Sequence, residues 1–343
     1  MITDKERLLK ILNKEKTDRV ACICPGGMMN MITTDLMDIS GISLPEAHLD
    51  PVMMANLALA SYENGCFENI GLPFCMTIEA EEMGAEVTMG SKVFEPHVTG
   101  YAYDCVSEWR KLKPIDLSNG RARVVLDAIK ILKSKNLDAP IVGNITGPIS
   151  TASSVIEPVS FYKSLRKDNK TVHEYMEFVT DEIIKFANAQ IDAGADVIAI
   201  SDPSGTGEIL GPKFFDEFVV RYINRILDGI KDRNVGTIVH ICGQMKNVYN
   251  EVGKITSDAL SFDSIVSIKE SRKHLGDRVL MGNVSTYALE FATEEKVQAL
   301  TRACIRSGSN IISPACGLGT RSPIANIQSL IKAIMQEDYQ EES

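Results

Sequence analysis

Residues 171–201 read TVHEYMEFVTDEIIKFANAQIDAGADVIAIS, and the change of pattern inside this stretch decides the fold class. Its first part, 171–193, places apolar side chains along one stripe at helical spacing. Its last part, 197–201, is a short run of Val, Ile and Ala, which is typical of a strand buried on both faces. An amphipathic helix that leads directly into a buried strand is the repeating unit of an α/β protein with a parallel sheet.

The same order of helix and strand repeats along the chain. Short apolar runs rich in Val and Ile recur, and the segments between them have helical periodicity. A helix also precedes the first run, because Thr3-Asp4-Lys5-Glu6 has the form of a capping box. Eight strands that alternate with helices over roughly 300 residues predict a (β/α)8 TIM barrel, with a doubly wound sheet as the alternative. The predicted strands are Val20–Cys24, Asn69–Pro73, Pro140–Asn144, Val197–Ser201, Thr237–Ile241, Ala259–Phe262, Val279–Gly282 and Asn310–Ser313.

Two regions depart from this alternation. Residues 75–110 contain the β-like pieces Glu86–Met89 and Lys92–Glu95 among several glycines, which predicts a small β-hairpin excursion from the barrel. The acidic, polar segment Gln336–Ser343 is predicted to be a frayed tail. Nothing else resembles a linker, so we expect residues 1–343 to form a single domain.

Composition narrows the classes of partner. The chain has 36 Lys and Arg against 46 Asp and Glu, a formal net charge of −10, which argues against nucleic acid and anionic membrane surfaces as partners. The N-terminus is charged at once, and no apolar run approaches the roughly 18 residues of a membrane-spanning helix. We therefore expect a cytoplasmic protein whose eight cysteines are reduced thiols. The oligomeric state is left open.

The strand ends carry the candidate chemistry, because barrels of this type build their active sites at the C-terminal ends of the strands. His240 and Cys242 stand two positions apart at the end of the fifth predicted strand, so their side chains point the same way. Cys316 follows the eighth predicted strand. One histidine and two cysteines can form a catalytic zinc (Zn²⁺) site with an open fourth position, and thiolates favour zinc over magnesium or calcium.

Other interpretations of these three residues are open. His240 can be a hydrogen-bonded core histidine, with Cys242 and Cys316 as small buried apolar residues. A disulfide between the two cysteines is a further alternative, against which a reducing compartment argues.

Polar residues at other strand ends are weaker candidates. Asp202 follows the fourth predicted strand and either holds a polar group in the barrel mouth or caps a helix, and Asn144 and Asn283 have the same ambiguity. Glu81 lies beside Glu79 and Glu82 after the second strand, and one acid of the three is expected to reach the pocket as a fourth zinc ligand or a proton acceptor.

The order of several motifs resembles the uroporphyrinogen decarboxylase superfamily over essentially the whole chain. The motifs are Gly147-Pro148, Ala193-Gly194-Ala195-Asp196 before Ile200-Ser201-Asp202, His240-Ile241-Cys242-Gly243, and Gly282-Asn283. The resemblance implies a TIM barrel. Decarboxylases of this superfamily carry an arginine-rich segment near the N-terminus, whereas Cys24–Asn30 contains no arginine here.

The branch that matches is the methylcobalamin:coenzyme M methyltransferase group, which binds zinc through His-x-Cys and a distant Cys. His240, Cys242 and Cys316 fall on that pattern. The resemblance implies that a thiol substrate is deprotonated at zinc and attacks the methyl group of a methylated corrinoid. That corrinoid is methylcobalamin or is carried by a partner corrinoid protein.

We therefore predict a zinc-dependent methyltransferase that moves a methyl group from a corrinoid to a small thiol such as coenzyme M. Asp202 and Glu81 are the predicted catalytic residues, and Asn144 and Asn283 the predicted cofactor-binding residues. The alternatives are a methyltransferase that passes methyl from an ether or amine to a corrinoid protein, a uroporphyrinogen decarboxylase, and a metal-stabilised scaffold without turnover.

Overall fold

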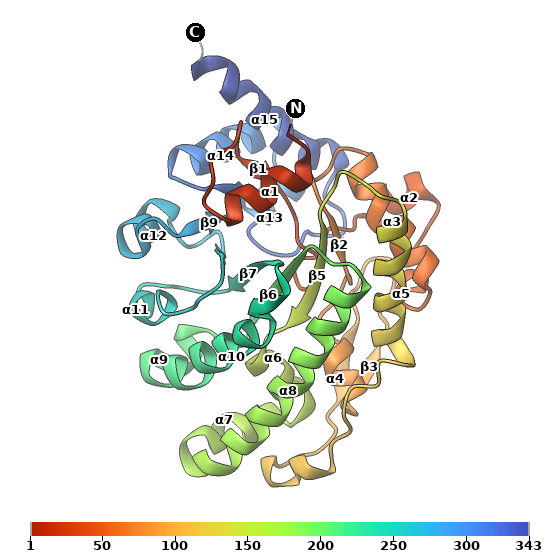
Figure 1. Cartoon of the computed structure of the whole chain (residues 1–343), viewed down its shortest axis with the longest axis vertical. Coiled ribbons are helices and arrows are strands. Elements are labelled where there is room, and N and C mark those ends of the chain that lie inside the picture. The colour runs from red at the N-terminus through yellow and green to blue at the C-terminus, as the bar shows by residue number, and fades with distance from the viewer. Residues whose placement is uncertain (1, 342–343) are drawn as a thin grey trace.

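A computed structural model describes residues 2–341 and contains a curled sheet of eight parallel strands surrounded by helices (Figure 1). The strands follow the spatial order β1-β10-β9-β8-β7-β6-β5-β2, and all of their residues are buried. Each predicted strand overlaps one strand of this sheet, so the predicted barrel is confirmed. The strands are β1 (Ala21–Cys22), β2 (Ile70–Leu72), β5 (Ile141–Thr146), β6 (Val197–Ser201), β7 (Gly236–Ile241), β8 (Ala259–Phe262), β9 (Val279–Met281) and β10 (Ile311–Ile312).

Helices connect the strands and cover the outside of the sheet (Figure 1). The predicted N-terminal capping box is confirmed, because Glu6 N donates to Thr3 Oγ1 and Thr3 N donates to Glu6 Oε2. The α-helices are α1 (Asp4–Leu12), α2 (Thr34–Ser40), α3 (Pro51–Glu63), α4 (Ile78–Glu82), α5 (Gly120–Ser134), α6 (Pro148–Val155), α7 (Pro158–Lys167), α8 (Asn169–Ala193), α9 (Gly207–Phe214), α10 (Arg221–Ile230), α11 (Tyr249–Val252), α12 (Ile268–Leu275), α13 (Thr286–Phe291), α14 (Glu294–Arg306) and α15 (Ile324–Glu341). Shorter helical turns are η1 (Glu46–His48), η2 (Val106–Lys111), η3 (Phe215–Val220) and η4 (Lys231–Arg233).

β1 and β2, the two ends of the spatial order, are joined mostly by side-chain hydrogen bonds. Asn69 is fully buried, and its amide accepts a hydrogen bond from Cys24 N at 2.9 Å and donates one to Cys24 O at 2.8 Å. Glu68 N donates to Cys22 O at 2.8 Å, and the Glu68 carboxylate accepts from Cys22 N. These bonds join β1 to the segment before β2 and close the barrel.

The hairpin excursion is confirmed, but one of its predicted strands is wrong. β3 (Glu86–Thr88) pairs with β4 (His97–Gly100) in an antiparallel ribbon, whereas the predicted second strand, Lys92–Glu95, lies in the connection. The chain reverses there because Gly90 adopts a positive φ of 74° and Ser91 N donates to Phe94 O. Figure 1 shows β3 at the same end of the molecule as α4 and α7, opposite both termini.

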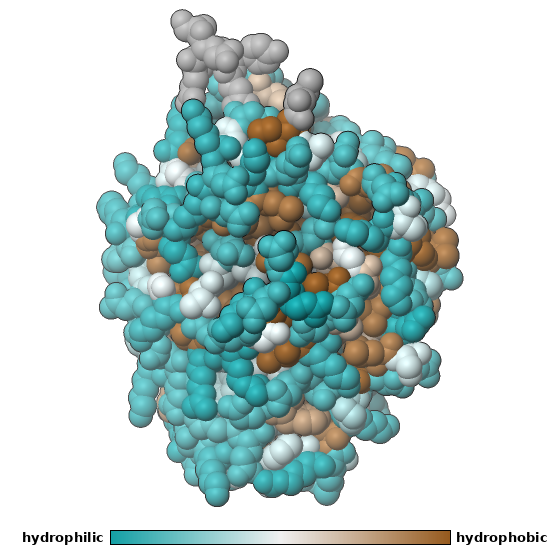
Figure 2. Space-filling view, viewed as in Figure 1, coloured by the Kyte–Doolittle hydropathy of each residue, from teal (hydrophilic) through white to brown (hydrophobic). Residues whose placement is uncertain are grey.

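The C-terminal end differs from its prediction. The sequence predicts fraying over Gln336–Ser343, but α15 continues as a helix to Glu341, and residues 342–343 lie outside the described residues. On the face shown in Figure 2, hydrophilic residues cover most of the surface and hydrophobic patches are scattered between them. No helix among the described residues is long and apolar enough to cross a membrane.

Replacement of Asn69 by Ala should destabilise the barrel strongly. The change leaves the buried backbone N–H and C=O of Cys24 without partners, so we expect the free energy of unfolding to fall by about 3 kcal/mol. Denaturant titration of both variants measures this loss. Asn64→Ala, which removes one partly exposed bond to Ala60 O, should cost at most about 1 kcal/mol. Equal costs for the two variants would contradict the closing role of Asn69.

Candidate metal centre

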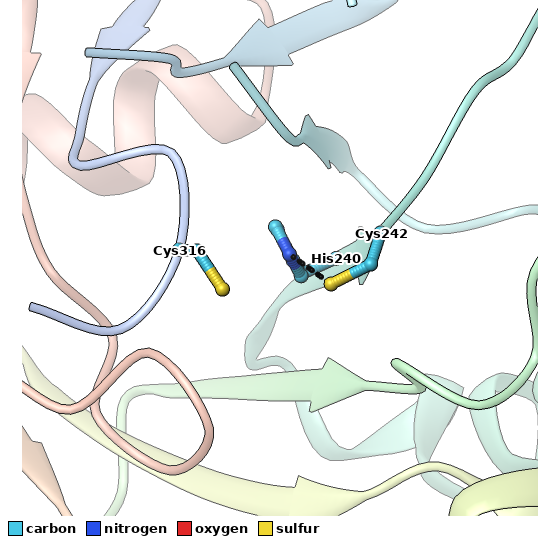
Figure 3. A group of neighbouring side chains, drawn as sticks. All are labelled: His240, Cys242 and Cys316. Atoms are coloured by element: carbon cyan, nitrogen blue, oxygen red, sulfur yellow. Dashed lines mark hydrogen bonds between the residues drawn. The ribbon is translucent and has the colours of Figure 1, made fainter. Parts of the chain in front are cut away.

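β7 places the first two candidate ligands at the barrel mouth. Its backbone pairs with β6 on one side and β8 on the other, which fixes the alternation of its side chains. His240 is 1% exposed, and its Nδ1 lies 2.9 Å from Ser261 Oγ on β8. His240 Nε2 lies 3.3 Å from Cys242 Sγ (Figure 3). Ile241, between them in the strand, points to the opposite face and is fully buried.

Cys316 approaches the same point from the loop after β10. Gly317 permits this approach, because a Cβ at that position would lie 2.6 Å from Met28 O. Leu318 N donates to Asn30 O at 2.9 Å, which fastens the loop to the segment after β1. The Cys316 thiol lies 3.5 Å from Met28 Sδ and points toward His240 (Figure 3).

The structure thus brings together the three predicted metal ligands. One nitrogen and two sulfurs, from His240, Cys242 and Cys316, lie within 4.8 Å of one another. Both cysteines are free, so the alternative of a disulfide between them is wrong. The donor set suits zinc, and among residues 2–337, whose side chains the structure describes, no fourth His, Cys, Asp or Glu completes the group. A zinc ion bound by these three side chains alone would keep a fourth position for an exchangeable ligand.

The two thiols have opposite pKa shifts. A hydrogen bond from Cys242 lowers the pKa of Cys316, and His240 lowers it further, while the same bond and burial raise the pKa of Cys242. The shifts favour loss of the proton from Cys316 before Cys242, and a metal ion bound here would require both thiols to be deprotonated.

Asp202 caps a neighbouring helix. Its Oδ1 accepts hydrogen bonds from Ser150 N at 2.7 Å and Ser150 Oγ at 2.6 Å, and its Oδ2 accepts one from Ile149 N at 3.1 Å. These donors belong to the first turn of α6, so the helix-cap alternative describes what Asp202 does. Burial raises its pKa. Its predicted catalytic role remains a prediction.

The two asparagines hold loops. Asn144 Nδ2 donates to Pro25 O at 2.6 Å and to Leu72 O at 3.1 Å, which joins the loop after β1 to the end of β2. Asn283 Nδ2 donates to Asp263 O at 2.7 Å and to Val266 O at 2.8 Å in the loop after β8. Both Nδ2 groups are therefore occupied by backbone carbonyls, whereas Asn144 Oδ1 is buried without a hydrogen-bond partner among the described side chains. The predicted contact of the two asparagines with a cofactor remains a prediction.

The acids of α4 divide between two environments. Glu81 is partly exposed and forms an ion pair with the buried Arg121 at 2.7 Å. Arg121 also donates to Cys75 Sγ at 2.7 Å. Glu79 is instead buried, and it accepts hydrogen bonds from Thr146 N at 2.7 Å and Thr146 Oγ1 at 2.9 Å at the end of β5. The acid that reaches the barrel mouth is therefore Glu79, while Glu81 faces Arg121.

Two acids near the thiols were missed from the sequence. Asp263 raises the pKa of Cys242, and it could have been found because it directly follows the strand Ala259–Phe262. Glu95 is electrostatically coupled to Cys316. No sequence pattern indicated Glu95 as a site residue, because it follows the hairpin turn and lies far in sequence from every strand end of the barrel.

The fold and the site define a class: parallel α/β barrels with one histidine and two cysteines at the C-terminal mouth. The family model described as "Uroporphyrinogen decarboxylase (URO-D)" matches residues 3–336, so the chain belongs to this family, as the resemblance implied. It is similar to the methylcobamide:CoM methyltransferase MtbA of Methanosarcina acetivorans, with 32% identity over 98% of this chain and 99% of that protein.

Two further comparisons agree. The methylcobamide:CoM methyltransferase MtaA of Methanosarcina barkeri is 33% identical over 96% of this chain and 97% of its own. A solved structure described as a methyltransferase from Methanosarcina mazei superposes with a TM-score of 0.91 at 33% identity, covering 98% of this chain and 99% of that one.

Replacement of Glu79 by Gln should make stability less dependent on pH. Burial raises the pKa of Glu79 to about 7 in the folded chain, from an ordinary value of 4.5. The protonated folded form is thus favoured, and this stabilisation is complete below about pH 4.5 and is lost as pH rises to about 7. Its size is about 3 kcal/mol.

Denaturant titrations at several pH values test this expectation. The variant should lose less stability than the native chain as pH rises across that range, because its side chain does not ionise. Glu63→Gln, a change at an exposed position, is the control and should follow the native profile. If the stability of Glu79→Gln depended on pH as that of the native chain does, the raised pKa assigned to Glu79 would be wrong.

Proposed function

We propose that this chain is a zinc-dependent methyltransferase that moves a methyl group from a methylated corrinoid to a small thiol. The observation that carries the proposal is the convergence of His240 Nε2, Cys242 Sγ and Cys316 Sγ at the barrel mouth. The relatives are named methylcobamide:CoM methyltransferases. On this basis we propose methylcobamide as the methyl donor and coenzyme M as the acceptor for this chain.

The residues present fit zinc in chemistry and in orientation. Ser261 lies against His240 Nδ1, so Nε2 is the nitrogen left to face the two sulfurs. Two thiolates and a neutral imidazole balance the charge of one Zn²⁺. Zinc in this position would stabilise a substrate thiolate by its positive charge and keep it nucleophilic at neutral pH.

The chain's own residues keep this centre rigid. Ser261 holds the imidazole ring from the neighbouring strand, and Met28 packs against the Cys316 thiol. Asp202 fixes the first turn of α6 beside the mouth. Because these supports come from different connections of the barrel, the sulfurs are held in place before any ligand arrives, and the reaction avoids the cost of ordering them.

The other functions receive less support from the geometry. A scaffold with a structural metal needs a closed set of four protein ligands, whereas three converge among the described residues. A decarboxylase for an anionic tetrapyrrole needs cations after β1. Cys24–Asn30 supplies none, and Met28 of this segment packs on Cys316 instead.

The partners and the compartment are inferred from the same chemistry. We propose a small thiol and a corrinoid, free or carried by a corrinoid protein, as the two substrates. Cys242 and Cys316 must be reduced to bind metal, so we propose a reducing compartment such as the cytoplasm.

Zinc content should depend on the three ligands. The purified chain should hold about one zinc ion. Cys316→Ser and His240→Ala should lower metal affinity by at least about 100-fold, because each leaves two protein ligands. Cys105→Ala, at an exposed cysteine of the excursion, is the matched control and should keep its zinc. Metal analysis after dialysis against a chelator measures these values, and full zinc content in Cys316→Ser would refute the assignment.

Methyl transfer should be visible with free methylcobalamin. The zinc-loaded chain and 2-mercaptoethanesulfonate should generate the cobalt(I) absorption spectrum, and Cys316→Ser should reduce the rate by at least about 100-fold. A panel of neutral and cationic thiols ranks the acceptors. If no thiol reacts, but methyl ethers or amines methylate cobalt(I) corrinoid, the chain runs the opposite half-reaction and the proposed direction is wrong.

A further inference from the structure

Glu95 belongs to the hairpin excursion and lies beside the loop that follows Cys316. It directly follows the turn Ser91–Phe94 and lines a cavity of about 410 Å³. The other walls of this cavity include Leu318–Arg321, from the loop that carries Cys316, and Glu290 of α13. The excursion therefore places a carboxyl group beside one of the two metal-binding loops.

Short contacts fix Glu95 relative to the candidate metal centre. Asn30 is fully buried, and its Nδ2 donates to Glu95 Oε1 at 3.1 Å. The same residue accepts a hydrogen bond from Leu318 N, two positions after Cys316. Met28, two positions before Asn30, contacts the Cys316 thiol at 3.5 Å. One short segment thus touches both the Glu95 carboxyl group and the Cys316 sulfur.

The second oxygen of Glu95 is available. Within residues 2–341, Asn30 is the side chain that donates to this carboxyl group, and it reaches Oε1 only. Burial raises the pKa of Glu95 to about 7, while the hydrogen bond from Asn30 lowers it, and the nearby Cys75 raises it. His48 is itself neutral, because burial lowers its pKa to about 3. Glu95 can therefore exchange a proton near neutral pH.

The other acids at the mouth are less suited to proton exchange. Both oxygens of Asp202 accept bonds from α6, and both oxygens of Glu79 accept bonds from Thr146. Asp263 Oδ1 accepts from Ser264 Oγ and Ile265 N, so Asp263 has one oxygen without such a partner and is the single competitor among these acids. Glu95 lines the cavity beside the loop that follows Cys316, whereas Asp263 is not among the residues that line this cavity.

We propose that Glu95 accepts the proton that the thiol substrate loses on binding beside Cys316. This inference rests on the proposed function, since it assumes that a thiol is the substrate. The S–H bond of the thiol breaks, its electron pair stays on sulfur, and the proton passes to Glu95 Oε2. A carboxylate becomes a carboxylic acid, so the total charge inside the site is unchanged when the thiol enters. The remaining charged groups of the cavity are Glu290 and Arg321.

The number of protons released on thiol binding tests this proposal without methyl transfer. Zinc-loaded protein is titrated with 2-mercaptoethanesulfonate by calorimetry at about pH 7.5, where a thiol is mostly protonated. Buffers of different ionisation enthalpy report the released protons. The native chain should release less than about half a proton per thiol, because Glu95 retains it, and Glu95→Gln should release about one. Gln keeps an oxygen for Asn30, so the hairpin contact survives.

Two further variants make the result specific. Glu290→Gln is the same substitution in the same cavity and should behave as the native chain. Release of a full proton by the native chain, or a change caused by Asp263→Asn in place of Glu95→Gln, would overturn the role of Glu95. If the native chain binds thiol and retains the proton but transfers no methyl group, the proposed function is wrong and the role of Glu95 stands. If no thiol binds, both are wrong.

Discussion

The alternation of side chains along β7 is the constraint on which the candidate metal centre depends. Parallel partners on both edges hold the backbone of β7, so it cannot rotate to exchange its two faces. His240 and Cys242 must therefore face the mouth together. The register also pairs His240 with Ser261 on β8, which accounts for the contact that orients the imidazole ring. A shift of one residue would send both ligands into the layer between the strands and the helices.

Cys316 is positioned by a different kind of interaction. β10 has two residues and ends before the ligand, so pairing in the sheet does not determine where the loop after it goes. The loop is held by contact with the segment after β1, where Gly317 lies against the backbone of Met28 and Leu318 bonds to Asn30. Asn144 holds the start of the same segment by its hydrogen bond to Pro25 O. Asn69 holds the chain just after β1 by accepting a hydrogen bond from Cys24 N. The position of Cys316 therefore depends on the same segment that closes the barrel.

Periodicity in the sequence predicted the barrel strands and placed the side chains of His240 and Cys242 on the same face of one strand. The prediction failed where the chain is not periodic. Glu81 was predicted from the sequence, whereas Glu79 is the acid bonded to the end of β5, because α4 has five residues and its pattern does not define a buried face. The second hairpin strand was placed too early, because turn residues and strand residues look alike between Gly90 and His97. Glu95 was missed because its position depends on long-range contacts with Asn30 and the cavity beside Leu318.

Hydrogen bonding separates the acids of the mouth into two groups that composition cannot distinguish. A buried carboxylate whose oxygens accept several backbone and hydroxyl donors is held in one geometry. Asp202 and Glu79 are of this kind, and they connect α6 and α4 to the strands. A carboxylate with one donor can gain a proton at little structural cost, as at Glu95. Because the two metal-binding thiols already place negative charge here, an incoming thiolate would add more unless a neighbouring acid is neutralised at the same time.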